Sequence, residues 1–516
     1  MSPWMTFHNM TTPSPFLLAN VYTAGGAVTA PSTRKGSDDV ETISCKDLLH
    51  QAAAIAQFLP DTPGASIAFF AHRNLDYLRC QWAIWLANHI AVPLSPHNTL
   101  RERSYILQDS CTSLVLCRPS DQTLLERIST AVAVIDLDTT AAIWNTSVTD
   151  MTPWLTKTTD HDAMLMYTSG TTGFPKGVLS THSSLMAQMT DLTTAWALGP
   201  CDRVLHFLPL HHTHGILNNL NAPLFAGAHV ECLASASADA IWAALSRDTA
   251  LPSVSVLMAV PSIYMLLLEA FAKMEPEAQK VAVAGAKRLR VAISGSMACP
   301  ISILTRWEAL TGTSLLERYG MTECGMALGN PLVGTRHVGY VGQPFPSVQA
   351  RVVQDGELQV RGPTLFKAYW NRPDETQSEW TTDGWFKTGD VAEYNATFAS
   401  YRILGRASVD ILKSAGYKVS ALEIERVILE HPQVRECAVY GVPDDTWGQI
   451  VASVVRLDAG TSGIEQLEPP LVEFLKLNLA KYKIPRIFHV VDAIPKNAMG
   501  KVNKKSLPSL FDVQAP

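Results

Sequence analysis

The sequence predicts an α/β protein with a large N-terminal domain of parallel sheets flanked by helices and a small α+β domain at the C-terminus. Three observations predict this fold class. Before residue 310, short aliphatic runs alternate with segments of helical spacing, which is typical of parallel strands covered by helices. Near residue 350 the pattern changes to paired strands. After residue 410, a compact tail carries helices and strands of its own.

Composition limits the class of protein before any motif is considered. The chain has 516 residues, of which 47% are apolar and 17% charged, and this balance excludes a disordered polymer. A net charge of −6 offers no basic footprint for nucleic acid or an anionic membrane. The longest apolar stretch, residues 254–272, contains Pro261 and Glu269, so we expect a buried strand and a helix there and not a membrane span.

The elements of the first half follow from hydrophobic spacing. Apolar residues three or four apart indicate helices, and short aliphatic runs indicate buried strands. We therefore expect a helix over Lys46–Leu59, a strand at Ser66–Phe70, a helix over Leu75–Asn88, and strands at Leu114–Cys117 and Val132–Asp136.

The second half begins with the same pattern and then changes. A strand at Arg290–Ile293 runs into Ser294-Gly295-Ser296, and a helix over Leu304–Leu310 follows. Val348–Val353 and Glu357–Val360 flank Gln354-Asp355-Gly356, which is a strong hairpin signal.

The tail has enough apolar elements for a small core. We expect helices over Ala421–Leu429 and Leu471–Leu479 and strands at Glu436–Tyr440 and Ile450–Leu457. The predicted organisation is an N-terminal domain at 1–404, a hinge at 405–409 and a C-terminal domain at 410–516.

The nine cysteines are scattered singly, without the spacing of a zinc site. Such a set is typical of reduced thiols in an intracellular compartment. The first 33 residues hold no acidic group, as in an organellar transit peptide, but they hold no Lys or Arg either. A cytoplasmic location is therefore favoured, and a mitochondrial one stays open.

Residues 167–177 form a glycine- and hydroxyl-rich segment, Tyr-Thr-Ser-Gly-Thr-Thr-Gly-Phe-Pro-Lys-Gly. Glycines let the backbone approach a ligand closely, and hydroxyl and amide groups donate hydrogen bonds to phosphate oxygens. Pro175 stands where a Walker A loop has its second glycine, so this is a different phosphate loop. The alternative is a flexible linker, but a linker has no need for a single lysine between Pro and Gly. The candidate phosphate-binding residues are Thr168, Ser169, Gly170, Thr171, Thr172, Gly173 and Lys176.

This segment resembles the signature of the acyl-adenylate-forming (AMP-binding) superfamily, which contains acyl-CoA synthetases, non-ribosomal peptide adenylation domains and luciferases. Further segments resemble the superfamily in the same order along the chain, at residues 208–215, 317–323, 386–390, 405–425 and 495–501. Within the superfamily, most of residues 160–505 is similar to the malonyl-CoA synthetase branch. The resemblance also implies a β-barrel-like subdomain in the N-terminal domain and a mobile C-terminal domain.

The activity that the resemblance implies is that of an ATP-dependent acid–CoA ligase. A carboxylate attacks the α-phosphate of ATP to form an acyl-AMP intermediate and pyrophosphate, and the CoA thiol then forms a thioester. Because two anions must meet, a metal and fixed donors have to neutralise their repulsion. The expected partners are a small carboxylic acid, ATP, Mg²⁺ and CoA, with no nucleic acid and no membrane span. The sequence leaves the oligomeric state open.

The resemblance also assigns roles to single residues. Glu323, with Thr168, would hold Mg²⁺, and Thr322 would bond the α-phosphate. Tyr319 would offer a face to adenine, and Asp390 would accept hydrogen bonds from the ribose. The other implied nucleotide-binding residues are Gly295, Ser296, Glu317, Gly320, Met321, Arg406 and Lys501.

Lys501 is implied as the mobile catalytic residue, acting with Thr322 and Glu323. It would bridge the carboxylate and the α-phosphate during adenylation and then move away, so that a loop with Gly416 and Tyr417 meets the pantetheine of CoA. Many relatives have Asp or Lys where Ser408 stands. The hinge pivot therefore stays open among Ala407, Ser408 and Val409.

The nature of the acid is suggested by a histidine cluster at positions 206, 211, 212 and 214. A zinc site, structural histidines and a polar substrate pocket are the alternatives, and no cysteine or acid lies nearby at ligand spacing. An arginine opposite a histidine could bind a second carboxylate bidentately. The hypothesis is that Arg290, with His214 or His212, binds the distal carboxylate of malonate or a related small dicarboxylate.

Two other functions stay open. A stand-alone adenylation enzyme would load an amino, aryl or fatty acid onto CoA or a carrier-protein phosphopantetheine, and Asp239 is the candidate anchor for an ammonium group. A degenerate scaffold protein would have damaged motifs. Lys176, Glu323 and Lys501 are all present, which favours the enzyme.

Overall fold

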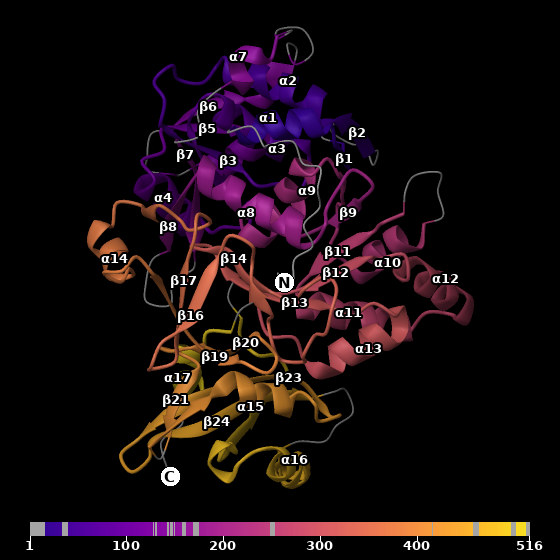
Figure 1. The fold of residues 1–516 in the computed structure, drawn as a ribbon, viewed down its shortest axis with the longest axis vertical. Helices are drawn as coiled ribbons and strands as arrows, with labels where there is room; N and C mark the ends of the chain where they lie inside the picture. The colour runs from indigo at the N-terminus through magenta and orange to yellow at the C-terminus, as the bar shows by residue number, and fades with distance from the viewer. Residues whose placement is uncertain are drawn as a thin grey trace.

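The computed structural model describes residues 16–32, 40–126, 128, 132–141, 144, 148, 150–156, 161–168, 175–247, 253–414, 416–457, 464–496 and 502–511. The N-terminal sheets and their helices form one end of an elongated molecule, and the C-terminal elements form the other (Figure 1). Within these ranges, no helix combines the length and the apolar character that crossing a membrane requires.

The first sheet has seven strands in the order β18-β8-β7-β4-β3-β5-β6. All neighbours from β7 to β6 in this order pair in parallel. Strand β8 is antiparallel to β7. The predicted strands at 66–70 and 114–117 are confirmed with the same bounds. The strands are β3 (Ser66–Phe70), β4 (Ile90–Leu94), β5 (Leu114–Cys117), β6 (Ala133–Asp136), β7 (Asp162–Thr168), β8 (Lys176–Thr181) and β18 (Ala368–Tyr369).

The second sheet has nine strands in the order β15-β14-β13-β12-β11-β9-β10-β1-β2. Its five central strands run parallel, so their carboxyl ends meet at one edge. The strands are β1 (Ala27–Pro31), β2 (Val40–Ser44), β9 (Arg203–His206), β10 (His229–Cys232), β11 (Val256–Ala259), β12 (Val291–Ser294), β13 (Leu316–Met321), β14 (Gly325–Gly329) and β15 (Gln343–Pro344).

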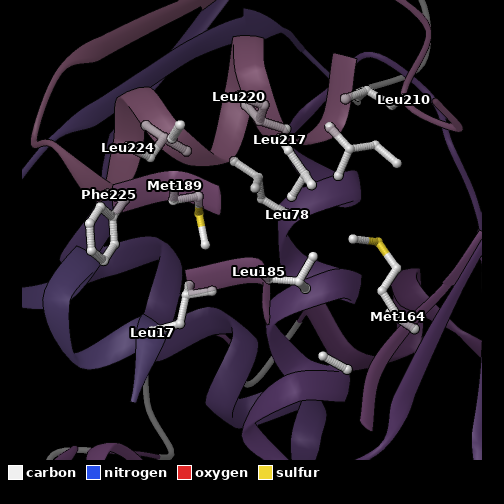
Figure 2. Close-up of a cluster of buried hydrophobic side chains, with 14 of the residues drawn as sticks. Leu17, Leu78, Met164, Leu185, Met189, Leu210, Leu217, Leu220, Leu224 and Phe225 are labelled. Carbon is white, nitrogen blue, oxygen red and sulfur yellow. The ribbon is translucent and has the colours of Figure 1, made fainter. Parts of the chain in front are cut away.

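Helices between the two sheets join them into one core. Leu185 and Met189 of α8 pack with Leu217 and Leu220 of the π-helix η2 and with Met164 of β7 (Figure 2). Another core lies under the helices on the outer face of the second sheet, around Trp242, Tyr264 and Trp307. The helices of this part are α1 (Leu17–Ala24), α2 (Cys45–Ala56), α3 (Leu75–Leu86), α4 (Leu100–Asp109), α5 (Pro119–Gln122), α6 (Leu137–Ala141), α7 (Thr152–Leu155), α8 (His182–Ala195), η2 (His214–Asn221), α9 (Ala222–Phe225), α10 (Ala238–Ser246), α11 (Pro261–Ala272), α12 (Pro276–Ala286) and α13 (Ile301–Thr311).

The predicted hairpin opens a four-stranded antiparallel sheet, β16-β17-β19-β20, in the region where the barrel-like subdomain was expected. Its described strands form an open sheet, since β16 and β20 are its two edges. The elements are β16 (Gln349–Val352), β17 (Glu357–Arg361), α14 (Pro373–Ser378), β19 (Phe386–Asn395) and β20 (Ser400–Arg406).

The C-terminal elements bury two apolar clusters of their own, one around Val419, Ile424 and Leu475 and one around Tyr440 and Leu507. The predicted helices and strands of the tail are all present with shifted ends. They are β21 (Ile411–Ser414), β22 (Tyr417–Ser420), α15 (Ala421–Ile428), β23 (Val434–Asp444), β24 (Gly448–Leu457), α16 (Ile464–Asn478), β25 (Ile487–Val490) and α17 (Leu507–Leu510).

Candidate active site

The carboxyl ends of β12 and β13 bring together most of the residues predicted to bind a nucleotide. Ser294 at the end of β12 pairs with Glu317 of β13, and the chain then turns through Gly295 and Ser296. Ser296 has a φ of +71°, and β13 changes register against β14 between Tyr319 and Gly320. These irregularities widen the edge of the sheet, as expected where a ligand approaches the backbone.

Tyr319, Asp390 and Arg406 form one hydrogen-bonded group at this edge. Asp390 on β19 and Arg406 on β20 are cross-strand partners, so the antiparallel sheet holds the two side chains together. The Asp390 carboxylate accepts hydrogen bonds from the Tyr319 hydroxyl at 2.6 Å and from Arg406 Nε at 2.9 Å. Sequence positions far apart therefore supply one polar cluster.

Glu317 is buried and has a local partner. Its carboxylate accepts a hydrogen bond from the Cys299 N–H at 3.2 Å, which ties the loop after β12 to β13. Burial raises the pKa of Glu317. These contacts indicate that the side chain shapes the loop at Gly295 and Ser296.

Thr322 and Glu323 lie in the turn between β13 and β14. The Glu323 carboxylate is buried and accepts a hydrogen bond from the Tyr369 hydroxyl at 2.9 Å. Burial raises the pKa of Glu323. Sequence reasoning missed Tyr369, and its place after the aromatic-rich segment from Phe366 is the only signal for it.

The two ends of the phosphate loop are placed by the β7–β8 pair. Thr168 ends β7 and Lys176 begins β8, and the two residues are register partners. Lys176 Nζ lies 2.6 Å from Glu375 Oε2 and 4.9 Å from the centre of the Tyr369 ring. Tyr369 thus touches both Lys176 and Glu323. The predicted residues Ser169, Gly170, Thr171, Thr172, Gly173 and Lys501 lie outside the described residues.

A buried arginine lies next to the loop after β12. Arg318 of β13 is 6% exposed, and its Nε and Nη2 atoms have no hydrogen-bond partner among the described residues. A Cβ on Gly295 would lie 2.4 Å from Arg318 Cζ, so glycine leaves room for the guanidinium. Burial lowers the pKa of Arg318 to about 10, which still leaves it charged at neutral pH.

His214 is the histidine nearest to this arginine. Its Nδ1 atom lies 3.5 Å from Ser296 Oγ, and its Nε2 has no partner within the described part of the chain. Burial and the nearby charge of Arg318 hold the pKa of His214 well below its usual value, so the ring is neutral. His214, Ser296 and Arg318 therefore form a polar cluster with one positive charge.

The structure does not support the role predicted for Arg290. Arg290 precedes β12, at the opposite end from Ser294, about 13 Å away along an extended chain. Its guanidinium is held by the Asp202 carboxylate, with Nε 2.7 Å from Oδ1, and by the carbonyl oxygens of Trp196 and Ala197. A parallel strand presents only its carboxyl end to the site, so the strand residue before β12 cannot serve the pocket.

The remaining histidines have other surroundings. His206 Nε2 lies 3.1 Å from the Gly215 carbonyl oxygen, and burial lowers the pKa of His206 to about 4. The rings of His211 and His212 lie against each other in a tilted arrangement, with centres 4.2 Å apart. Within the described ranges, no three His, Cys, Asp or Glu side chains are grouped as metal ligands. Asp239 lies exposed in the first turn of α10, which disfavours it as a buried ammonium anchor.

Gly416 and Tyr417 lie at the tip of the β21–β22 hairpin. Gly416 has a φ of +82°, which favours glycine there. Tyr417 is 55% exposed and stacks on Tyr482 at 4.4 Å. In this arrangement the hairpin tip faces outward.

The two largely parallel sheets and the polar cluster at the carboxyl ends of β12 and β13 are typical of a nucleotide-binding α/β enzyme. The description "AMP-binding enzyme" matches residues 24–370, and "AMP-binding enzyme C-terminal domain" matches residues 423–501. The chain belongs to the AMP-binding enzyme family.

Curated relatives cover most of the chain. The mitochondrial malonate–CoA ligase ACSF3 of Xenopus laevis is 41% identical over 86% of this chain and 82% of its own length. The malonate–CoA ligase of Arabidopsis thaliana is 37% identical over 87% and 79%. A sulfoacetate–CoA ligase of Cupriavidus necator is 37% identical over 67% of each chain.

Solved structures show the same fold. ATP-bound MatB from Rhodopseudomonas palustris has a TM-score of 0.83 at 30% identity, covering 97% of this chain and 99% of that one. A malonyl-CoA ligase in a ternary product complex with methylmalonyl-CoA and AMP has a TM-score of 0.63 at 31% identity, covering 96% and 99%.

Proposed function

We propose that the protein is an ATP-dependent acid–CoA ligase that converts malonate, or a related small dicarboxylate, into its CoA thioester through an acyl-AMP intermediate. The observation that carries the substrate is Arg318, a buried guanidinium beside Gly295 and near His214, with two nitrogens that have no partner among the described residues. Relatives named malonate–CoA ligase support the same activity.

The pocket suits an acid with a second anionic end. A buried charge without a partner is costly, so Arg318 gains from a ligand that brings a negative charge. A guanidinium binds a carboxylate through two parallel hydrogen bonds. Neutral His214 can donate or accept a further hydrogen bond without adding charge. The first carboxylate of malonate then remains for adenylation.

The polar cluster of Tyr319, Asp390 and Arg406 suits the nucleotide. The Asp390 carboxylate would accept hydrogen bonds from the ribose hydroxyls, with Arg406 and Tyr319 fixing its orientation. Gly295, Ser296, Gly320 and Met321 would border the adenine. Thr322 and Lys176 would donate to phosphate oxygens, and Lys501 would bring its charge to the α-phosphate during adenylation.

A single buried carboxylate suits Mg²⁺, which takes few protein ligands and keeps phosphate oxygens and waters. Glu323 would hold the ion, with the hydroxyl of Thr168 as a further oxygen donor. Bound there, Mg²⁺ would neutralise charge on the phosphates. Tyr369 keeps the Glu323 carboxylate oriented through its hydroxyl.

The C-terminal domain is proposed to move between two half-reactions. We place the N-terminal domain at 1–404, the hinge at 405–409 and the C-terminal domain at 410–516. Gly416 and Tyr417 would turn inward to meet the pantetheine of CoA. The lower TM-score with the product complex than with the ATP-bound structure, at similar identity, supports two overall arrangements in such chains.

We infer an intracellular location. All nine cysteines are free thiols, and relatives from frog, mouse, cattle and human carry a mitochondrial location in their names. Cell fractionation distinguishes the cytoplasm from the mitochondrion, and a secreted product would contradict the inference.

Pyrophosphate release on mixing the enzyme with ATP, Mg²⁺ and CoA tests the proposed substrate. The panel contains malonate, methylmalonate, sulfoacetate, butyrate, a long-chain acid and amino acids. We expect malonate to give the highest kcat/KM, with sulfoacetate as the second candidate because a sulfonate also suits Arg318. Highest turnover with an amino, aryl or fatty acid would contradict a dicarboxylate substrate.

Arg318→Met tests the pocket directly. We expect kcat/KM for malonate to fall about 100-fold or more, because a buried charge pair is lost. Activity with butyrate should rise, a gain that misfolding cannot produce. The control Arg290→Lys keeps the pair with Asp202 and should change malonate turnover less than about threefold. Unchanged malonate turnover in Arg318→Met would contradict the assignment.

A further inference from the structure

The Lys176 ammonium has an acidic partner that the reaction itself does not require. Lys176 Nζ lies 2.6 Å from Glu375 Oε2, and the two side chains are 27% and 40% exposed. The same ammonium lies 4.9 Å from the centre of the Tyr369 ring. The cation that we propose for phosphate is therefore paired with a carboxylate of the protein itself.

Glu375 is held in place independently of Lys176. Arg372 Nη1 lies 2.9 Å from Glu375 Oε1, so the carboxylate is shared by two cations. Arg372 Nη2 in turn donates to the Tyr105 hydroxyl of α4 at 3.0 Å. Trp370 Nε1 donates to the Asp109 carbonyl oxygen of α4 at 2.9 Å. Because Arg372 and α4 anchor α14, Glu375 stays where it is when Lys176 moves.

The residues on either side of the predicted phosphate loop are tied to the same helix. The Tyr105 hydroxyl donates to the Pro175 carbonyl oxygen at 3.0 Å, immediately before Lys176. The Tyr167 hydroxyl donates to Asp109 Oδ2 at 2.7 Å at the other end of the loop. Helix α4 thus fixes both the base of Lys176 and the position of Glu375, and the flexible methylenes of the lysine remain free to exchange partners.

We propose that Glu375 is a positioning residue that acts as an exchangeable counterion for Lys176, competing with the triphosphate of ATP and taking the lysine back when pyrophosphate leaves. The inference rests on the proposed function, since the exchanged anions are the nucleotide phosphates of that reaction. No bond is formed or broken in the exchange.

The energetic argument sets the size of the effect. A triphosphate with its several charges outcompetes one carboxylate, so ATP still binds. Each binding event nevertheless breaks a Lys176–Glu375 pair, and partly exposed pairs are worth up to about fivefold in an equilibrium constant. The remaining Glu375 charge also repels the bound phosphates. Removing the charge should therefore strengthen the binding of ATP and of pyrophosphate.

The experiment measures equilibrium binding of Mg²⁺–ATP and of inorganic pyrophosphate to the full chain by calorimetry, without acid or CoA. Glu375→Gln should bind both about three- to fivefold more tightly than the wild type. Glu375→Asp should restore wild-type affinity, because it keeps the charge. Asp374→Asn is the matched control: it removes a carboxylate from the same first turn of α14, and the described structure gives Asp374 no ion pair. It should leave both affinities unchanged.

Turnover gives a second readout that a purely structural role would not produce. Glu375→Gln should lower KM for ATP and strengthen product inhibition by pyrophosphate three- to fivefold, without raising kcat. Unchanged or weaker binding in Glu375→Gln, with a wild-type melting temperature, would overturn the inference and leave the ligase assignment intact. A wild-type chain that binds no ATP would instead contradict the proposed function.

Discussion

At the scale of single residues, the availability of a side chain depends on the partners that the fold supplies. Arg290 and Arg318 carry the same charge, yet Asp202 and two carbonyl oxygens occupy Arg290, whereas two nitrogens of Arg318 have no partner among the described residues. Tyr319 and Arg406 likewise orient the carboxylate of Asp390, which we propose as the receptor for ribose. Whether a side chain can bind a ligand here therefore depends on the hydrogen-bond partners that the protein already gives it.

Tyr369→Phe tests whether the Tyr369 hydroxyl, which donates a hydrogen bond to Glu323, contributes to Mg²⁺ binding. The substitution keeps the ring over Lys176 but removes the hydroxyl that donates to the carboxylate. Groups that orient a metal-binding carboxylate are typically worth about tenfold or more in metal affinity. We expect the Mg²⁺ concentration for half-maximal pyrophosphate release to rise about tenfold. The control is Tyr394→Phe, an exposed position. An unchanged Mg²⁺ dependence would show that Tyr369 does not contribute to metal binding.

At the scale of elements, parallel strands decide which residues can meet. Residues after β12 and within β13 reach the site because both strands end at the same edge. The helix α8 has a structural role beneath that edge, where Leu185 and Met189 pack between the sheets (Figure 2). It also buries Asp191, whose carboxylate accepts hydrogen bonds from the backbone N–H and the hydroxyl of Ser347.

Asp191 predicts a pH dependence of stability. Burial raises its pKa from the ordinary 3.8 to about 6, even though Ser347 opposes the shift. The folded protein thus holds a proton that the unfolded chain releases, so stability is lost as pH rises from about 4 to about 6. At pH 7.5, Asp191→Asn should raise the free energy of unfolding by up to about 3 kcal/mol, and the melting temperature should rise with it. At pH 4.5 the gain should shrink to about a third of that value, because the folded carboxyl is then protonated and the unfolded one is only partly ionised. An equal gain at both pH values would show that the effect is not ionisation.

At the scale of the whole molecule, the N-terminal and C-terminal parts of the chain have separate hydrophobic cores. The N-terminal sheets share their buried side chains with the helices between and around them, whereas residues 412–511 bury two clusters of their own. Contacts such as the Arg435–Glu269 ion pair join the two parts, with partly exposed side chains. Such surface pairs are weak compared with a buried core.

This division predicts that the C-terminal part folds alone. A fragment of residues 410–516 should give a cooperative thermal transition by circular dichroism, because its apolar clusters do not depend on the N-terminal sheets. The companion fragment 1–404 should lose pyrophosphate release, since Arg406 and Lys501 are both absent from it. A fragment 410–516 that stays unfolded would place the boundary elsewhere.

The sequence by itself determined the fold class, most elements and the ordered nucleotide motifs, because these are patterns among neighbouring residues. Hydrophobic spacing located β3 and β5 to the residue, and the run around Thr168 and Lys176 marked a phosphate loop. Only the tertiary structure showed that Arg318 is buried with two nitrogens lacking a partner among the described residues, and that Glu375 faces Lys176. Burial and charge pairing depend on side chains from distant segments, and no local pattern records which of two similar residues will find a partner.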